Sequence, residues 1–307
     1  MKLVIAEKPS VGKSIAAVLK ADKRENGFFI GNGYIVSWCI GHLLEQANTT
    51  AYDEKYKKWN YSHLPIVPQE WKYTVSSEKS RQLKILNDLM KRSDVETIVN
   101  AADAGREGEL IFRLVYEKCE CKKPIQRLWV SSMEECSLLE GFRNLRDGAD
   151  YENLYQSALC RSRADWLVGI NATQLFSILY KDTLNVGRVQ SPTLALLVKR
   201  QLNIDNFIRE PFYVPEINCG DFVASSEKTK DKLQAETIRN ACEGKTATIH
   251  EIEQKNKTIA PPKLYDLTTL QREANRTFDY TAQQSLAYIR SLYEKKLATY
   301  QIGRAHV

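Results

Sequence analysis

Apolar residues recur with two different periods in the first half of the chain. Three short apolar runs predict strands, and a helical period follows each of them: strands at Lys2–Ala6, Glu96–Ala101 and Arg127–Val130, and helices at Ser10–Lys20, Glu107–Lys118 and Glu134–Asn144. Phe28–Ile30 and Tyr34–Ile40 flank Gly31-Asn32-Gly33, which predicts a hairpin. Ser80–Met90 has a helical period. The repeated β–α alternation predicts a mostly parallel sheet with helices on its faces.

The pattern changes near residue 150. Long helical periods and two β-like stretches then follow: helices at Tyr151–Tyr180, Pro192–Ile208, Leu264–Arg276 and Ala282–Lys296, and β-like stretches at Phe212–Val223 and Lys245–Glu253. Ala260-Pro261-Pro262 has the composition of a linker. Helical, β-rich and again helical segments after an α/β region predict a multi-domain protein.

Composition narrows the class of protein. A chain of 307 residues suggests two or three domains. Its net charge of +6 permits a polyanionic partner without requiring one. No apolar run approaches the ~20 residues of a membrane span, and the first apolar run ends at Glu7, too early for a signal peptide. Seven scattered cysteines, an odd number, favour reduced thiols and an intracellular location.

Carboxylates follow two of the predicted strands. Glu7 comes directly after the first strand, and Asp103 and Glu107 follow the second. Ligands of open α/β sheets lie outside the carboxyl ends of the strands, and Mg²⁺ prefers oxygen ligands. These three residues therefore predict a Mg²⁺ site, whereas Glu109 is expected to face elsewhere on its helix. An alternative remains open, in which Asp103 and Glu107 only stabilise the start of a helix.

One nearby segment resembles a phosphate-binding loop without being one. Gly12-Lys13-Ser14 matches the end of a P-loop, but Glu7 occupies the position of the first glycine. A carboxylate there would repel phosphate, which argues against ATP binding.

An acidic residue after the first strand and an Asp-x-x-x-Glu motif after a later strand resemble a Toprim domain. Further segments resemble type IA DNA topoisomerases, in particular the topoisomerase III branch: Trp38–Glu45, Trp59-Asn60 with Leu64–Pro68, Ser157–Asn171 and Val186–Leu194. The last two are specific to type IA enzymes, and the resemblance covers residues 1–300 nearly continuously.

The resemblance implies a fold class, an α/β Toprim domain followed by incomplete helical and β-rich domains. Residues 1–150 are expected to form the Toprim domain and 151–210 the first part of a helical groove for single-stranded DNA. Residues 211–263 would begin a β-rich arch. Residues 264–300 would start the helical domain that carries the nucleophile.

The resemblance also implies a mechanism. A tyrosine attacks single-stranded DNA, a 5′-phosphotyrosine link keeps the bond energy, DNA passes through the break, and the break is rejoined without ATP. The implied catalytic residues are Glu7, Lys8 and Arg188, and the implied Mg²⁺ ligands are Glu7, Asp103 and Glu107. The implied DNA contacts are Trp59, Arg161, Arg163, Trp166, Gln174, Lys181, Asn185, Val186, Gly187, Arg188, Val189 and Gln190. For both tryptophans, packing in the protein core is an equal alternative.

Three positions depart from the family pattern. Gly105, which favours a tight turn, stands where most members have a second aspartate, so a single Mg²⁺ site is expected. Gln174 stands where some relatives have arginine, which weakens the expected DNA contact. After Tyr300 the family continues with Pro-Arg-(Thr/Ser)-Asp and the catalytic tyrosine, whereas this chain continues with residues 301–307. We interpret these seven residues as a foreign tail, because a common sequencing-adapter sequence encodes them.

Other functions compete with that of a cleaving topoisomerase. Without the nucleophile, the chain is expected not to cut DNA alone, and a non-cleaving fragment that binds Mg²⁺ and DNA is the alternative. A Toprim nuclease or primase is disfavoured, because those reactions do not need the Val186–Leu194 motif. We expect a monomer that binds single-stranded DNA and no membrane. We expect it in the bacterial cytoplasm, associated with the nucleoid or with plasmids.

Overall fold

The computed structural model describes residues 1–130, 132–294 and 297–298. It divides into two units, Met1–Ser191 with Tyr265–Val307 and Pro192–Leu264. A seven-stranded sheet forms the centre of the first unit, in the order β2-β3-β4-β1-β7-β8-β9. Its strands are β1 Lys2–Ala6, β2 Lys23–Glu25, β3 Phe28–Gly31, β4 Tyr34–Trp38, β7 Thr97–Ala101, β8 Ile125–Arg127 and β9 Arg146–Asp147. The four central strands, β4, β1, β7 and β8, are parallel, and the outer strands are antiparallel.

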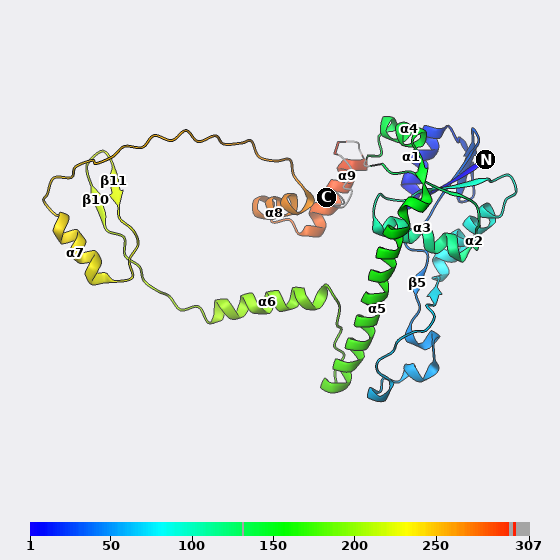
Figure 1. Ribbon diagram of the computed structural model, residues 1–307, viewed down its shortest axis with the longest axis horizontal. Helices are drawn as coiled ribbons and strands as arrows, with labels where there is room; N and C mark the ends of the chain where they lie inside the picture. The colour runs from blue at the N-terminus through cyan, green and yellow to red at the C-terminus, as the bar shows by residue number, and fades with distance from the viewer. Residues whose placement is uncertain (131, 295–296, 299–307) are drawn as a thin grey trace. The chain divides into compact units, whose positions relative to one another are not determined.

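Helices cover both faces of this sheet, as the sequence predicts (Figure 1). Successive residues of β1 point to opposite faces, so Leu3 and Ile5 join one core cluster while Val4 and Ala6 join the other. The first cluster is completed by α2 (Ser77–Met90), α3 (Arg106–Lys118) and the start of α5 (Glu152–Tyr180). The second is completed by α1 (Pro9–Leu19) and α4 (Glu135–Arg143). The α/β fold predicted for this region is confirmed.

The third strand lies earlier than the sequence predicts. Strand β8 is Ile125–Arg127, and the run Arg127–Val130 is not a strand of its own. The apolar character of Leu128 and Val130 comes from helix packing, because both side chains lie against Gly141 of α4. A Cβ added at Gly141 would lie 2.5 Å from Val130 and 2.7 Å from Leu128.

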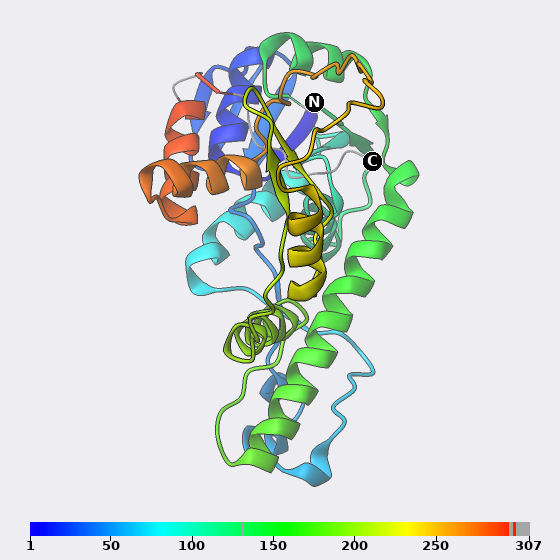
Figure 2. The same ribbon diagram turned by 90° about the vertical axis from the view of Figure 1, so that its left-hand side faces the viewer.

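A long excursion between β4 and α2 docks on helix α5, as both views of the chain show (Figures 1 and 2). It contains the two-stranded pair β5 (Glu45–Gln46) and β6 (Tyr73–Thr74) and three short 3₁₀ helices, η1 Thr49–Ala51, η2 Glu54–Lys57 and η3 Tyr61–His63. The Asn171 amide of α5 bonds both backbone groups of Ile66, at 2.5 and 3.0 Å. These bonds satisfy polar groups of a segment that has no strand neighbour at this point.

The second unit carries little regular structure. Helix α6 (Gln190–Asp205) leads into it, followed by the antiparallel pair β10 (Glu216–Asn218) and β11 (Val223–Ser225) and by helix α7 (Lys232–Cys242). The strand predicted at Lys245–Glu253 is wrong, because these residues have no regular structure and every one of them is exposed. Alternating apolar residues form a strand only when another strand or a core lies against them.

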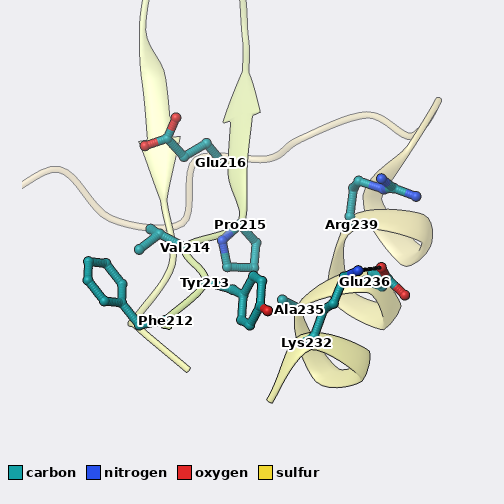
Figure 3. A pocket seen from close by; sticks show the side chains of 9 residues that line it. All are labelled: Phe212, Tyr213, Val214, Pro215, Glu216, Lys232, Ala235, Glu236 and Arg239. Atoms are coloured by element: carbon teal, nitrogen blue, oxygen red, sulfur yellow. Dashed lines mark ion pairs between the residues drawn. The ribbon is translucent and has the colours of Figure 1, made fainter. Parts of the chain in front are cut away.

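A pocket of about 450 Å³ lies between β10 and α7 in this unit (Figure 3). Tyr213 and Pro215 line it beside Lys232, and Lys232 pairs with Glu236 at 3.7 Å. None of the residues expected to bind DNA or metal lies in this pocket.

Two helices follow the extended stretch, α8 (Leu267–Phe278) and α9 (Ala282–Glu294), close to the predicted positions. They pack against each other, with Tyr280 between Phe278 and Tyr288 at ring distances of 5.4 and 5.1 Å. Tyr300 and the tail 301–307 lie outside the described residues. Within the described part of the chain, no helix combines the length and the apolar character needed to cross a membrane.

Candidate metal and nucleic-acid site

Two carboxylates meet at the carboxyl ends of β1 and β7. Ala6 and Ala101 are register neighbours in these parallel strands, so the residues that follow them leave the sheet side by side. The ammonium of Lys8 lies between the two acids, 3.3 Å from Glu7 Oε1 and 3.7 Å from Asp103 Oδ2. Glu7 is 8% exposed. The structure thus brings together Glu7, Lys8 and Asp103 as the sequence predicts.

The Asp103 backbone is held tightly. Its carbonyl accepts a hydrogen bond from Arg127 Nη2 at 2.8 Å. On the other side, a Cβ added at Gly108 would lie 2.2 Å from the same carbonyl oxygen, so helix α3 can approach only with glycine there. Gly105 is different: its φ of 175° is extended, and nothing lies within 4 Å of an added Cβ. The close approach of α3 therefore needs Gly108. The expectation that Gly105 is the glycine required by a tight turn is wrong.

A buried ion-pair network lies directly behind this loop. Glu109 is 0% exposed and pairs with Arg127 at 3.1 Å and with Arg113 at 3.0 Å. Asn100 Nδ2 also donates a hydrogen bond to Glu109 Oε2 at 2.9 Å. Burial lowers the pKa of the Arg127 guanidinium, and the negative charge of Glu109 opposes that shift. Glu109 faces the protein interior, as the sequence predicts, and is not a candidate metal ligand.

The chemistry of Glu7 and Asp103 fits a magnesium ion. Asp103 Oδ1 is buried and has no hydrogen-bond partner, which leaves one carboxylate oxygen for a further ligand. Carboxylate oxygens are the ligands that Mg²⁺ takes in proteins, usually one or two of them with water and phosphate. Across the described residues, however, no three acidic, histidine or cysteine side chains gather around one point. Of the three expected ligands, Glu7 and Asp103 thus lie together in this structure.

Glu107, the third expected ligand, points toward a different partner. Its Oε2 lies 3.5 Å from Nε2 of His42, in the loop after β4. Both residues border a pocket of about 320 Å³ between the loop after β4, α3 and α5, lined by His42, Gln46, Glu107, Leu110, Arg161, Ser162, Asp165 and Trp166. Acidic and basic groups thus line this pocket, and its volume is large enough for a phosphate and part of a nucleotide.

The sequence matches the Toprim domain family over residues 2–133 and the DNA topoisomerase family over residues 149–301. The DNA topoisomerase 3 of Bacillus cereus is 42% identical over 306 residues, which are 97% of this chain and 42% of that protein. The DNA topoisomerase 3 of Bacillus licheniformis is 40% identical over 306 residues, with the same shares. The chain belongs to the type IA DNA topoisomerases. It spans 42% of the length of these curated relatives.

A solved structure agrees with this family fold. Full-length topoisomerase I from Thermotoga maritima superimposes with a TM-score of 0.65 and 23% sequence identity. The superposition covers 95% of this chain and 46% of that one. At this identity the match shows the fold, and the site of this topoisomerase chain rests on its own residues.

Arg188 of this topoisomerase chain is fixed by a carboxylate of α5. Its Nε and Nη2 donate to the two oxygens of Asp165, the second bond measuring 3.3 Å. These hydrogen bonds raise the pKa of Arg188, which keeps the guanidinium charged. Asp165 lines the same pocket as Arg161 and Glu107. A forked ion pair of this kind orients the guanidinium toward one direction.

The segment around Val186 is fastened along α5. The Val186 amide donates to Thr173 Oγ1 at 3.0 Å, and the Leu184 amide donates to Ser177 Oγ at 2.9 Å. The Gly187 amide donates to Ser191 Oγ at 3.2 Å. These bonds leave the side chains of Asn185, Val189 and Gln190 exposed to solvent. Hydrogen bonds thus hold the segment along α5 while these side chains stay accessible to a ligand.

Two of the residues expected to contact DNA, Arg163 and Trp166 of α5, make packing contacts within the protein. Trp166 donates to the Ala47 carbonyl at 3.1 Å and packs edge-on against Tyr52 and Trp71, with ring distances of 5.6 and 5.5 Å. The Arg163 guanidinium lies 5.3 Å from the Trp71 ring centre. Trp166 is half-buried by these contacts and also borders the pocket, so its expected DNA contact stays a prediction.

Gln174 is a further correction. It is 3% exposed, so its side chain faces the protein and is not presented to DNA. By contrast, Trp59 is 45% exposed in the docked excursion, and Arg161 and Lys181 are exposed on α5 and at its end. These three residues remain candidates for DNA contact.

Four residues of the site were not singled out from the sequence. Asp165 and Arg127 make the ion pairs described above, His42 lies beside Glu107, and Asn171 fastens the docked excursion. Asp165 and Asn171 lie within the Ser157–Asn171 motif, so that motif was the available signal. Arg127 was hidden because it ends a short strand and resembles an ordinary surface arginine in the sequence.

Proposed function

We propose that this chain is the Mg²⁺- and DNA-binding front part of an ATP-independent DNA topoisomerase. The whole protein would break, pass and rejoin single-stranded DNA through a 5′-phosphotyrosine link, and so relax or decatenate DNA. The observation that carries the proposal is the Glu7–Lys8–Asp103 cluster at the ends of β1 and β7. The names of the bacterial relatives, DNA topoisomerase 3, support it.

Glu7 and Asp103 would hold the ion, and Glu107 would join them by turning away from His42. Bound Mg²⁺ supplies positive charge that orients a phosphate and the 3′-end of a broken strand. Lys8 already lies within ion-pair distance of both carboxylates. Its ammonium is therefore placed to stabilise negative charge on a phosphate oxygen beside them. Arg188, oriented by Asp165, would hold a neighbouring backbone phosphate.

The nucleophilic tyrosine is not assigned to any residue of this chain. In the family pattern it follows the Pro-Arg-(Thr/Ser)-Asp motif, and the residues after Tyr300 do not match that motif. We therefore propose that the 307 residues bind Mg²⁺ and DNA but do not cut DNA unaided. The chain would act as a monomer with DNA in the bacterial cytoplasm.

Binding and cleavage can be tested separately on the purified chain. Fluorescence anisotropy with a labelled single-stranded oligonucleotide should show binding that is tighter than for the matching duplex and that weakens as salt rises. Charge reversal of Arg188 (Arg188→Glu) should weaken binding, whereas Arg239→Glu in the second unit should not. No preference for single strands, or equal losses in both variants, would contradict the proposed DNA site.

Cleavage is tested with supercoiled plasmid and Mg²⁺. We expect no relaxation and no covalent protein–DNA adduct from the 307-residue chain. Relaxation by this chain would overturn the proposal that it does not cut alone. Nicking without an adduct would instead support a Toprim nuclease.

A further inference from the structure

Arg127 is among the largest fully buried side chains of the residues that the structure describes, and it points at the loop that carries Asp103. A buried guanidinium loses much hydration energy, which only well-placed partners recover. Its hydrogen-bond acceptors here are backbone carbonyls, three of which belong to residues 100–103 at the end of β7 and in the loop. We propose that Arg127 is a positioning residue that sets the direction of the Asp103 carboxylate for Mg²⁺. This inference rests on the Mg²⁺ site of the proposed function.

The hydrogen bonds of Arg127 follow the loop from strand to ligand. Nη1 donates to the carbonyls of Asn100 at 3.0 Å, Ala102 at 2.8 Å and Leu128 at 2.7 Å. Nη2 donates to the carbonyl of Asp103 at 2.8 Å. One planar group thus fixes the end of β7 and the metal-binding residue beyond it. A lysine ammonium at the same place has no second nitrogen to reach both carbonyl sets.

The plane of the guanidinium is fixed as well. Glu109 lies 3.1 Å from its Nε, and the rings of Trp129 and Tyr151 lie 5.0 and 5.8 Å away. Contacts of cations with aromatic faces favour one orientation of the group. With Glu109 beside Nε and the two rings beside the guanidinium, the two Nη atoms are directed at the backbone carbonyls.

The backbone of Asp103 is therefore constrained on two sides, by Arg127 and by Gly108. With the backbone fixed, the side chain keeps Oδ1 buried and without a partner and Oδ2 toward Lys8. Groups that orient metal ligands typically change metal affinity 10- to 100-fold when they are removed. Loss of the Arg127 clamp should therefore weaken Mg²⁺ binding even where the fold survives.

Arg113 provides a matched control, because it pairs with the same carboxylate, Glu109. Its guanidinium donates to the Gly148 carbonyl at 2.6 Å and lies 3.4 Å from Glu152, at the start of α5. Both arginines are largely buried and serve Glu109, but Arg113 is directed at α5 whereas Arg127 is directed at the metal loop.

The experiment compares Arg127→Lys and Arg113→Lys in the 307-residue chain. Thermal unfolding reports stability, and isothermal titration with Mg²⁺ reports affinity in the folded protein. We expect both variants to melt at lower temperature, and the Mg²⁺ dissociation constant to rise about tenfold or more in Arg127→Lys while staying unchanged in Arg113→Lys. A purely structural role would shift the melting temperature alone.

Equal affinities in the wild-type chain and in Arg127→Lys would overturn the inference and leave the Mg²⁺ site standing. Equal losses in both variants would overturn it too. A wild-type chain that binds no Mg²⁺ would overturn the proposed function together with it.

If Arg127→Lys does not fold, Asn100→Ala tests the same link without altering a buried charged side chain. Asn100 bonds Glu109 at 2.9 Å and accepts from the Ala102 amide at 3.1 Å, so it joins the network to the loop. The Mg²⁺ dissociation constant should rise several-fold, roughly at the lower end of the range for such partners. An unchanged value in folded Asn100→Ala would count against the inference.

Discussion

The sheet region, residues 2–130, and the second unit, residues 192–264, differ most in what their elements lie against. In the sheet region β1 and β7 are buried on both faces by two helical layers. In residues 192–264, all of which the structure describes, no side chain is buried, and Phe207 and Leu264 are among the most exposed apolar groups. Burial of apolar surface is the main favourable term in folding. The sheet region therefore has a core of its own, and the second unit does not.

This difference also explains where a precise site can form. Metal ligands must be held to a fraction of an ångström by side chains that are themselves fixed. The sheet region supplies this through adjacent strand ends, a close helix approach at Gly108 and the buried Arg127. The pocket of the second unit is lined by half-buried or exposed side chains such as Tyr213 and Lys232. Within residues 192–264, no buried side chains hold the residues that line this pocket in place.

The largest expected contrast is in stability. Phe112 of α3 is 1% exposed, whereas Phe207 is 71% exposed. Phe112→Ala should lower the free energy of unfolding by about 3–5 kcal/mol, since it leaves a cavity in the core. Phe207→Ala should change it by less than about 0.5 kcal/mol. Urea unfolding followed by circular dichroism measures both, and similar losses would contradict the comparison.

The next contrast concerns the metal. Glu7→Gln neutralises a proposed ligand at the end of β1 and should weaken Mg²⁺ binding at least about 100-fold, the upper end of what orienting partners contribute. Glu216→Gln neutralises a carboxylate of the second pocket and should leave Mg²⁺ affinity unchanged. Isothermal titration on both variants decides the matter. A loss with Glu216→Gln equal to that with Glu7→Gln would indicate nonspecific binding by acidic residues.

A third prediction separates two glycines of the same loop. Gly108→Ala places a Cβ against the Asp103 carbonyl and should lower the free energy of unfolding by about 1–3 kcal/mol. Gly105→Asp meets no atom and places a carboxylate before the first turn of α3, where it should be neutral or stabilising by about 0.5–1 kcal/mol. Mg²⁺ affinity should rise in Gly105→Asp. A destabilised Gly105→Asp would show that position 105 requires glycine for a reason other than room for a Cβ.

How much the sequence predicts follows the same division. The sequence was sufficient to predict strand β1, the β3–β4 hairpin and the proximity of Glu7 to Asp103, because strand period and strand ends are local signals. The limits of β8 could not be predicted, because the apolar residues Leu128 and Val130 pack against α4 and are not part of the strand. Lys245–Glu253 has the alternation of a strand, but the partner that would make it one is not encoded within the segment.

Side-chain direction was the other limit. Glu107 and Gln174 carry the right chemistry at the right spacing, yet one turns to His42 and the other is buried. Arg127 was missed for the converse reason, because burial of an arginine depends on distant carbonyls that no local pattern reveals. The residue types of a site are thus more predictable than the contacts that orient them.

The smallest expected effect runs in the opposite direction to that of Glu7→Gln. The Lys8 ammonium lies within 4 Å of both carboxylates, so it competes with Mg²⁺ for the same negative charge. Lys8→Gln should therefore tighten Mg²⁺ binding, by about two- to fivefold, because the pair is partly exposed to water. Lys232→Gln, which breaks the ion pair with Glu236 in the second unit, should not change it. Weaker Mg²⁺ binding in Lys8→Gln would mean that Lys8 helps to assemble the two acids instead of competing with the ion. Tighter Mg²⁺ binding combined with weaker affinity for single-stranded DNA in Lys8→Gln would indicate that the ammonium contacts both the carboxylate pair and a DNA phosphate.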